Sequence, residues 1–169
     1  MQLHIYGLES YRVKFDADAW NDRLPQMEPH ADTISAWARL VRARGIALAM
    51  VERALKGSGF PPLAWYDVLL ELERARQPMR PGTLQSNLLL AQYNLSRLLD
   101  RMAARGLIER RSDAADARVR LVAVTPVGRQ LRRRMWPVYA EALQRAVGDR
   151  LNADERRALV DLLGKILEQ

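Results

Sequence analysis

The chain has 169 residues, of which 49% are hydrophobic and 28% are charged, and its net charge is +7. These values are typical of one globular domain, or of a small domain built onto a dimerisation scaffold, and they exclude a disordered chain. The absence of cysteine excludes disulfides, thiolate metal sites and thiol-based redox sensing. No apolar run approaches the ~20 residues that span a membrane, and the N-terminus lacks a signal-peptide pattern. We therefore expect a cytoplasmic protein with no membrane partner.

The positive charge is concentrated in the middle of the chain. Residues 61–134 contain fourteen arginines and seven acidic residues, whereas the segments on either side are close to neutral. Arginine binds phosphate through two N–H groups and stays charged at any physiological pH, so this pattern favours a polyanionic partner. A general preference for arginine over lysine explains the residue type, but not its concentration in one segment.

The predicted elements follow from apolar spacing and from helix-capping residues. An N-terminal arm (1–31) precedes a helix that starts near Asp32, its expected N-cap, and ends at Gly57. The next elements are a helix that Pro61-Pro62 open in its first turn, a short helix over 83–89, a helix over 91–105, strands over 107–111 and 118–124, a long helix from Thr125-Pro126 to about 147, and a last helix from Asn152.

This order predicts a mostly α fold with a small β-hairpin wing. A winged helix-turn-helix module (61–125) would be embedded between an N-terminal dimerisation helix (32–60) and C-terminal dimerisation helices (126–169). The flanking helices carry more apolar surface than a module of this size could cover, which favours a homodimer.

The helix over 91–105 is the candidate recognition helix. Its leucines at 95, 98 and 99 share one face with Met102, while polar side chains occupy the opposite face. Such a face can reach base edges and phosphates of double-stranded DNA, although it also suits an ordinary amphipathic surface helix. Asp100 would be repelled by DNA unless a neighbouring arginine pairs with it. The candidate DNA-binding residues of this helix are Gln92, Tyr93, Asn94, Ser96, Arg97 and Arg101.

The predicted hairpin is the second DNA-binding candidate. Arginines flank a turn of small and acidic residues, as expected of a wing whose tip enters a minor groove, where negative potential attracts arginine. Solvated arginines on a plain hairpin are the alternative. The candidate wing residues are Arg110, Arg111, Asp116, Arg118 and Arg120.

From about residue 33 to its end, the chain resembles MarR-family transcriptional regulators. The likeness is carried by LSRLLDRM (95–102), GLIER (106–110), Asp116-Ala117-Arg118, VTPVG (124–128) and LNADER (151–156). The resemblance implies a ligand-responsive repressor that binds a pseudo-palindromic operator as a homodimer. It also implies that Arg118 enters the minor groove and that Asp116 holds the wing through a salt bridge. The chain departs from the family's pattern at Ala91, which cannot cap a helix, and in its long N-terminal arm.

The resemblance further implies a small hydrophobic or phenolic effector. Trp37, Trp65 and Tyr66 are candidates for lining its pocket, and plain core packing is the alternative for all three. No cofactor or metal is expected, because the two histidines, His4 and His30, both lie in the arm, and no catalytic, nucleotide-binding or metal-ligand motif is present. An enzyme is therefore not expected. The remaining alternative is a winged-helix adaptor that binds protein or RNA without operator-specific regulation, although an RNA reader should expose more stacking aromatics than Tyr93 alone.

Overall fold

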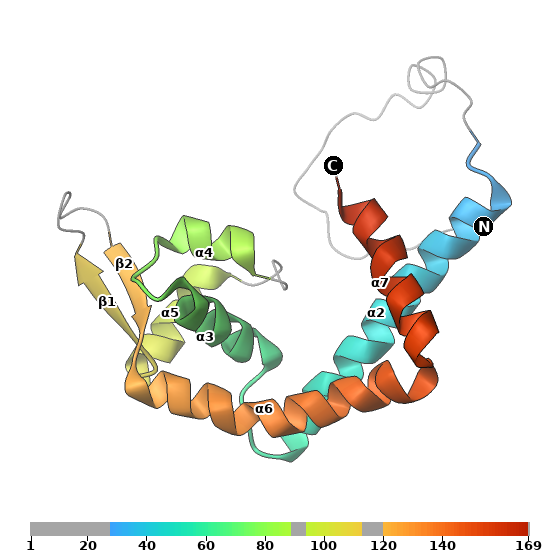
Figure 1. The fold of residues 1–169 in the computed structure, drawn as a ribbon. Coiled ribbons are helices and arrows are strands. Elements are labelled where there is room, and N and C mark those ends of the chain that lie inside the picture. Colours follow the sequence, from blue (N-terminus) through green and yellow to red (C-terminus); the bar gives the residue numbers. More distant parts are fainter. Residues whose placement is uncertain (1–27, 89–93, 113–119, 169) are drawn as a thin grey trace, which may run out of the picture. The chain divides into compact units, whose positions relative to one another are not determined.

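The computed structural model describes residues 28–88, 94–112 and 120–168. The chain divides into two compact units, residues 1–40 and residues 41–169. Helix α2 begins in the first unit and continues into the second. The elements are α2 (Ala31–Gly57), α3 (Leu63–Ala75), α4 (Pro81–Asn87), α5 (Leu95–Ala104), β1 (Ile108–Ser112), β2 (Arg120–Val124), α6 (Pro126–Ala146), the 3₁₀ turn η1 (Gly148–Arg150) and α7 (Ala153–Leu167) (Figure 1). This is the predicted order, a mostly helical chain with one hairpin.

Four predicted helix starts are wrong by a few residues. α3 begins at Leu63 with Pro62 as its N-cap, so the two prolines precede its first turn instead of opening it. α2 includes Asp32 in its first turn, so Asp32 is not its N-cap. α4 begins at Pro81 rather than at residue 83, because the fixed φ of proline suits a first helical turn. α5 begins at Leu95 rather than near Ala91, because Asn94 is its N-cap: Asn94 Oδ1 accepts a hydrogen bond from Arg97 N at 3.2 Å.

One hydrophobic core joins α3, α4, α5 and the hairpin. Its fully buried members include Leu69, Leu84, Leu98, Met102 and Val122. The two strands are antiparallel, with Ile108 opposite Val124 and Ser112 opposite Arg120. Met79, between α3 and α4, extends this sheet: Met79 N donates to Val122 O at 2.9 Å, and Val122 N donates to Met79 O at 2.8 Å. The helix-turn-helix segment is thereby tied directly to the hairpin.

A second core lies where the end of α2 and the start of α3 pack against α6. Its buried residues include Val51, Leu55, Tyr66, Met135 and Ala142. Because α3 contributes to both cores, it joins the hairpin-bearing module to α6 (Figure 1).

The junction between α5, the hairpin and α6 is held by Thr125, the predicted N-cap of α6. Thr125 Oγ1 donates to Gly106 O at 2.7 Å and accepts from Gly128 N at 3.1 Å, while Thr125 N donates to Leu107 O at 3.1 Å. α6 passes so close to the hairpin here that a Cβ added at Gly128 would lie 2.1 Å from Leu107 O. One hydroxyl therefore links the end of α5 to the start of α6.

α7 is well capped but poorly covered. Asn152 and Glu155 form the capping box at its start, which confirms the predicted N-terminus. No residue of α7 is buried, and its exposed apolar side chains are Leu159, Val160, Leu162, Ile166 and Leu167. Within the described residues, no helix is long and apolar enough to cross a membrane.

Candidate nucleic-acid interface

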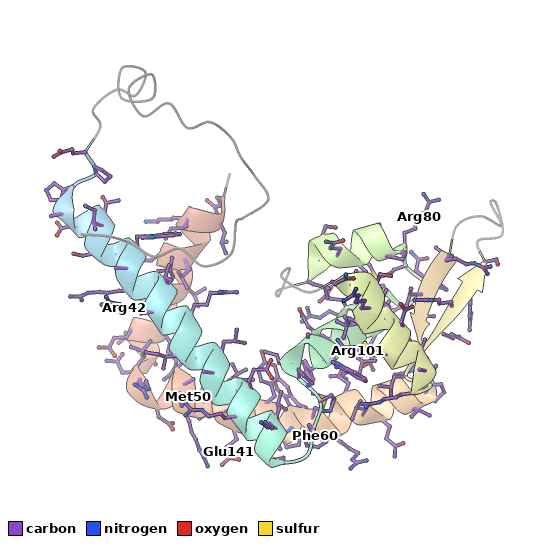
Figure 2. All side chains as sticks on the ribbon, turned by 180° about the vertical axis from the view of Figure 1, so that it is seen from behind. Arg42, Met50, Phe60, Arg80, Arg101 and Glu141 are labelled. Atoms are coloured by element: carbon purple, nitrogen blue, oxygen red, sulfur yellow. The ribbon has the colours of Figure 1, made fainter. Side chains whose placement is uncertain are left out.

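Helix α5 presents a polar face because its apolar face is fixed in the core. Leu95, Leu98, Leu99 and Met102 are buried, as the spacing predicted. Ser96, Arg97, Asp100 and Arg101 are exposed on the remaining surface, and Arg101 is labelled in Figure 2. The orientation of α5 about its axis is therefore fixed by its four buried residues. Arg97 and Arg101 are left on the exposed side, where an external partner can reach them.

Of the three N-terminal candidates of the recognition helix, the structure describes only Asn94. Asn94 is exposed, but its Oδ1 is engaged by the backbone of Arg97, so a partner would meet chiefly its amide nitrogen. Gln92 and Tyr93 lie outside the described residues.

The wing candidates separate onto the two faces of the hairpin. Arg110 forms an ion pair with Asp100 of α5, and Arg120 Nη1 donates to Ser112 Oγ at 3.1 Å. Arg111 pairs instead with Glu109, which lies two positions before it on the same strand and therefore on the same face. Arg110 and Arg120 thus lie on the side of α5, whereas Arg111 faces away from it. Asp116 and Arg118 lie outside the described residues.

A groove of about 380 Å³ runs between α4, α5 and the hairpin. Its polar lining consists of Gln85, Ser96, Asp100, Arg110 and Arg120. The carboxylate of Asp100 forms an ion pair with Arg110, the kind of arginine partner expected from the sequence if this surface meets DNA. This pair is neutral, so the charge of Arg120 keeps the groove net positive. Sequence reasoning missed Gln85, because nothing in the spacing of α4 indicates that it turns toward α5.

The three aromatic candidates for an effector pocket lie in different places. Tyr66 lines a cavity of about 240 Å³ between the C-terminal half of α2, α3 and α6. Trp65 is buried in the other core, with the Arg105 guanidinium 5.0 Å from its ring centre. Trp37 is 67% exposed and belongs to the first unit. Only Tyr66 of the three lines this cavity, and Tyr139 of α6, which sequence reasoning missed, lines it too.

Aromatic rings cluster beside this cavity. Tyr66 meets Tyr139 edge-on at 5.0 Å and stacks on Trp136 at 6.3 Å. Burial raises the pKa of the Tyr139 phenol, and the neighbouring Tyr66 and Asp67 raise it further. The Tyr139 hydroxyl therefore stays neutral and able to donate a hydrogen bond at physiological pH.

Arg132 anchors α6 to α3 beside the same rings. Its guanidinium pairs with Glu73 and lies 5.9 Å from the centre of the Tyr66 ring. Burial disfavours the charge of Arg132 and is the largest single effect, but the hydrogen bonds and charge interactions with Glu73 and Tyr66 together outweigh it, so the Arg132 pKa is raised. Among the described residues, no group of three or more histidine and acidic side chains is placed to hold a metal ion.

Sequence comparisons relate the chain to a known protein family. The model of the MarR family matches residues 58–119. The HTH-type transcriptional regulator YkoM of Bacillus subtilis is 30% identical over 113 residues, which are 67% of this chain and 71% of that protein.

Solved structures share the same fold. BpsR of Bordetella bronchiseptica, whose DNA binding is regulated by 6-hydroxynicotinic acid, superposes with a TM-score of 0.71 at 28% identity, covering 84% of this chain and 99% of BpsR. A mutant MarR of E. coli complexed with operator DNA superposes with a TM-score of 0.68 at 25% identity, covering 83% of this chain and 99% of that one.

Proposed function

Because the chain belongs to the MarR family of DNA-binding transcriptional regulators, we propose that it is a ligand-responsive repressor. In this proposal a homodimer binds a pseudo-palindromic operator and releases it when a small hydrophobic or phenolic effector binds. Its site of action is the cytoplasm, where bacterial operator DNA lies.

The observation that carries the DNA-binding role is the convergence of α4, α5 and the hairpin on one positive groove. Arg97 and Arg101 are exposed on α5, and Arg110 and Arg120 line the groove from the hairpin side. A helix in the major groove reads bases through its N-terminal half, which here carries Ser96 and Arg97, while flanking arginines bind phosphates. The wing candidates Asp116 and Arg118 complete the proposed surface, on the strength of the sequence alone.

Assembly into a dimer is supported by α7. A 15-residue helix without a single buried residue exposes Leu159, Leu162 and Ile166, which share one face, at 37%, 58% and 62%. A folded helix with such a face needs a partner surface, since contiguous apolar patches mark interaction sites. A second copy of the chain supplies an identical face, as two-fold symmetric interfaces require.

The effector role is supported by the cavity that Tyr66 and Tyr139 line. Apart from these phenols, Arg44 and Asp67, its lining is aliphatic, and its volume of about 240 Å³ lies just below the ~300–1,000 Å³ of drug-sized ligand pockets, so it suits a small compound. BpsR, which shares this fold, responds to 6-hydroxynicotinic acid. An effector releases DNA only if it binds the DNA-competent arrangement less tightly than the alternative.

The DNA-binding proposal is tested by sequencing the genomic fragments that the purified full-length protein retains, followed by titration of the enriched duplex. We expect a pseudo-palindrome with half-site centres ~34–36 Å apart, about one turn of DNA. A scrambled duplex and single-stranded RNA of equal length are the controls. Equal affinity for all three nucleic acids, or a preference for the RNA, would refute operator-specific regulation.

The effector proposal is tested on the same operator with a panel of phenols and aromatic carboxylates. A true effector should weaken operator binding and change tryptophan fluorescence together, because Trp136 stacks on Tyr66 beside the cavity. A panel that leaves both signals unchanged would remove the ligand-release part of the proposal while leaving DNA binding intact.

A further inference from the structure

A second cavity, of about 340 Å³, lies at the root of the hairpin on the face that points away from α5. The end of α3, the segment before α4, both strands and the start of α6 all contribute to its wall. Arg110 and Arg111 are adjacent on β1, so their side chains point to opposite faces: Arg110 lines the groove beside α5, and Arg111 lines this cavity. Neither the proposed DNA surface nor the proposed effector cavity uses it.

The charge of this cavity is positive and incompletely neutralised. Arg76, Arg111 and Arg129 line it from three separate elements. Glu109, also in the lining, pairs with Arg111. In the described parts of the chain, Arg76 and Arg129 have no carboxylate partner. Two guanidinium groups are therefore left to bind an anion, through the paired N–H donors that suit phosphate and carboxylate oxygens.

Apart from Gln77, the rest of the lining is apolar. Leu72, Pro78, Val124 and Pro126 form the surface between the arginines. A volume of about 340 Å³ is far larger than a single inorganic ion and lies within the range of small-molecule sites. A ligand that fills it must combine an anionic group for the arginines with an apolar body for these side chains.

We propose that this cavity binds a small organic anion, in which a phosphate or carboxylate group is carried on an aromatic or aliphatic body. The anionic group lies between Arg76 and Arg129, and the apolar body packs toward Pro78 and Pro126. A DNA duplex is too wide to enter a concavity of this size, so the site is separate from the DNA-reading surface.

The test is calorimetric titration of the full-length protein, without DNA, with four probes. Phenyl phosphate and benzoate carry both required parts, inorganic phosphate carries the charge alone, and phenol carries the ring alone. We expect phenyl phosphate to bind the site of Arg76 and Arg129 at least tenfold more tightly than inorganic phosphate or phenol do. Binding in the cavity beside Tyr66 would give a separate event that changes at Arg76 and Arg129 leave unaltered. Benzoate should bind at the same site, more weakly than the doubly charged ester.

Three variants and one matched control locate the site. Arg76→Gln and Arg129→Gln should each weaken phenyl phosphate binding at least tenfold. Ala123→Leu should weaken it by filling the cavity without changing any charge, since Ala123 belongs to the lining. Arg133→Gln removes the same charge from an exposed position of α6 outside the cavity and should leave the affinity within twofold.

Three results would overturn the proposal. Equal losses of phenyl phosphate affinity in Arg129→Gln and Arg133→Gln would show that the binding is general electrostatic attraction and not a defined site. Unchanged affinity in all three cavity variants would place phenyl phosphate elsewhere. A loss of operator affinity without ligand, as large in Arg76→Gln and Arg129→Gln as in Arg97→Ala, would assign these arginines to DNA. Because the titrations contain no DNA, failure of the anion site leaves the proposed repressor function standing, and the reverse also holds.

Discussion

Arg110 and Arg111 are neighbours in the sequence, yet they face different surroundings. Arg110 is held against Asp100 of α5, on the side of the proposed DNA surface, and Arg111 is held against Glu109 on the opposite side. Arg97 has no carboxylate partner within the described chain, and its backbone N–H is fixed by the Asn94 cap. Of the arginines on α5 and β1, Arg97 is therefore the best placed to read a base edge.

Arg97→Ala should weaken operator binding by about 1–3 kcal/mol, or about 5- to 150-fold, because a bidentate contact to a base or phosphate is lost. The difference in affinity between operator and scrambled DNA should decrease as well. Titrations at matched salt, with Arg133→Ala as a control of equal charge, measure both effects. Equal behaviour of Arg97→Ala and wild type would mean that α5 does not read this operator.

For individual residues, the sequence correctly predicted which side chains of α5 are buried, because this follows from helix geometry alone. The buried and exposed faces of α5 were predictable from the 100° step between residues. The identity of the arginine that pairs with Asp100 was not, because Arg110 lies on a strand whose position relative to α5 depends on the tertiary fold. The start of α5 was misplaced because Asn94 was assigned to the helix instead of its cap.

Among the elements, the hairpin and the start of α6 approach each other closely. Gly128 is buried against the carbonyl of Leu107 and the side chain of Leu69, and Thr125 bonds to both neighbouring segments. The caps at Thr125 and Asn152 were readable from the sequence, because capping is a local interaction. The bridge between Met79 and Val122 joins residues far apart in the chain, and no local pattern indicated it.

Gly128→Ala should lower the free energy of unfolding by about 1–3 kcal/mol, since the new methyl group would lie 2.1 Å from Leu107 O and 2.9 Å from Leu69 Cδ2. Gly45→Ala is the matched control: no atom lies within 4 Å of its new methyl group, and alanine favours a helix interior, so stability should rise by about 0.5–1 kcal/mol. Denaturant unfolding followed by circular dichroism measures both changes. A Gly128→Ala protein as stable as wild type would show that this contact relaxes freely.

For the whole molecule, the exposed face of α7 is the feature that the proposed dimer explains. The sequence predicted the apolar spacing of this helix correctly. In the proposed dimer the surface that covers it belongs to a second copy, which the spacing within one chain does not describe. The predicted domain boundaries at residues 60 and 125 likewise stay a prediction, because α3 contributes to both cores and no gap in packing separates the segments.

Leu162→Glu together with Ile166→Glu should convert the dimer into a monomer at micromolar concentration, because two carboxylates would be buried without partners in the interface. Lys165→Glu, at an exposed polar position of the same helix, should remain dimeric. Light scattering gives the mass, and operator affinity should fall in parallel with the loss of dimer. A monomeric mass for the wild-type protein would contradict the proposed homodimer.

The hydroxyl of Thr125 has a mechanical consequence for the proposed dimer. By bonding to both Gly106 and Gly128, it makes α5 and α6 turn together. The 21 residues of α6 form a lever arm about 30 Å long. A tilt of about 5° at its far end would displace α5 by about 2–3 Å, which approaches the ~3.4 Å rise of one base pair. In the proposed dimer, a displacement of this size could therefore move the two recognition helices out of register with their half-sites.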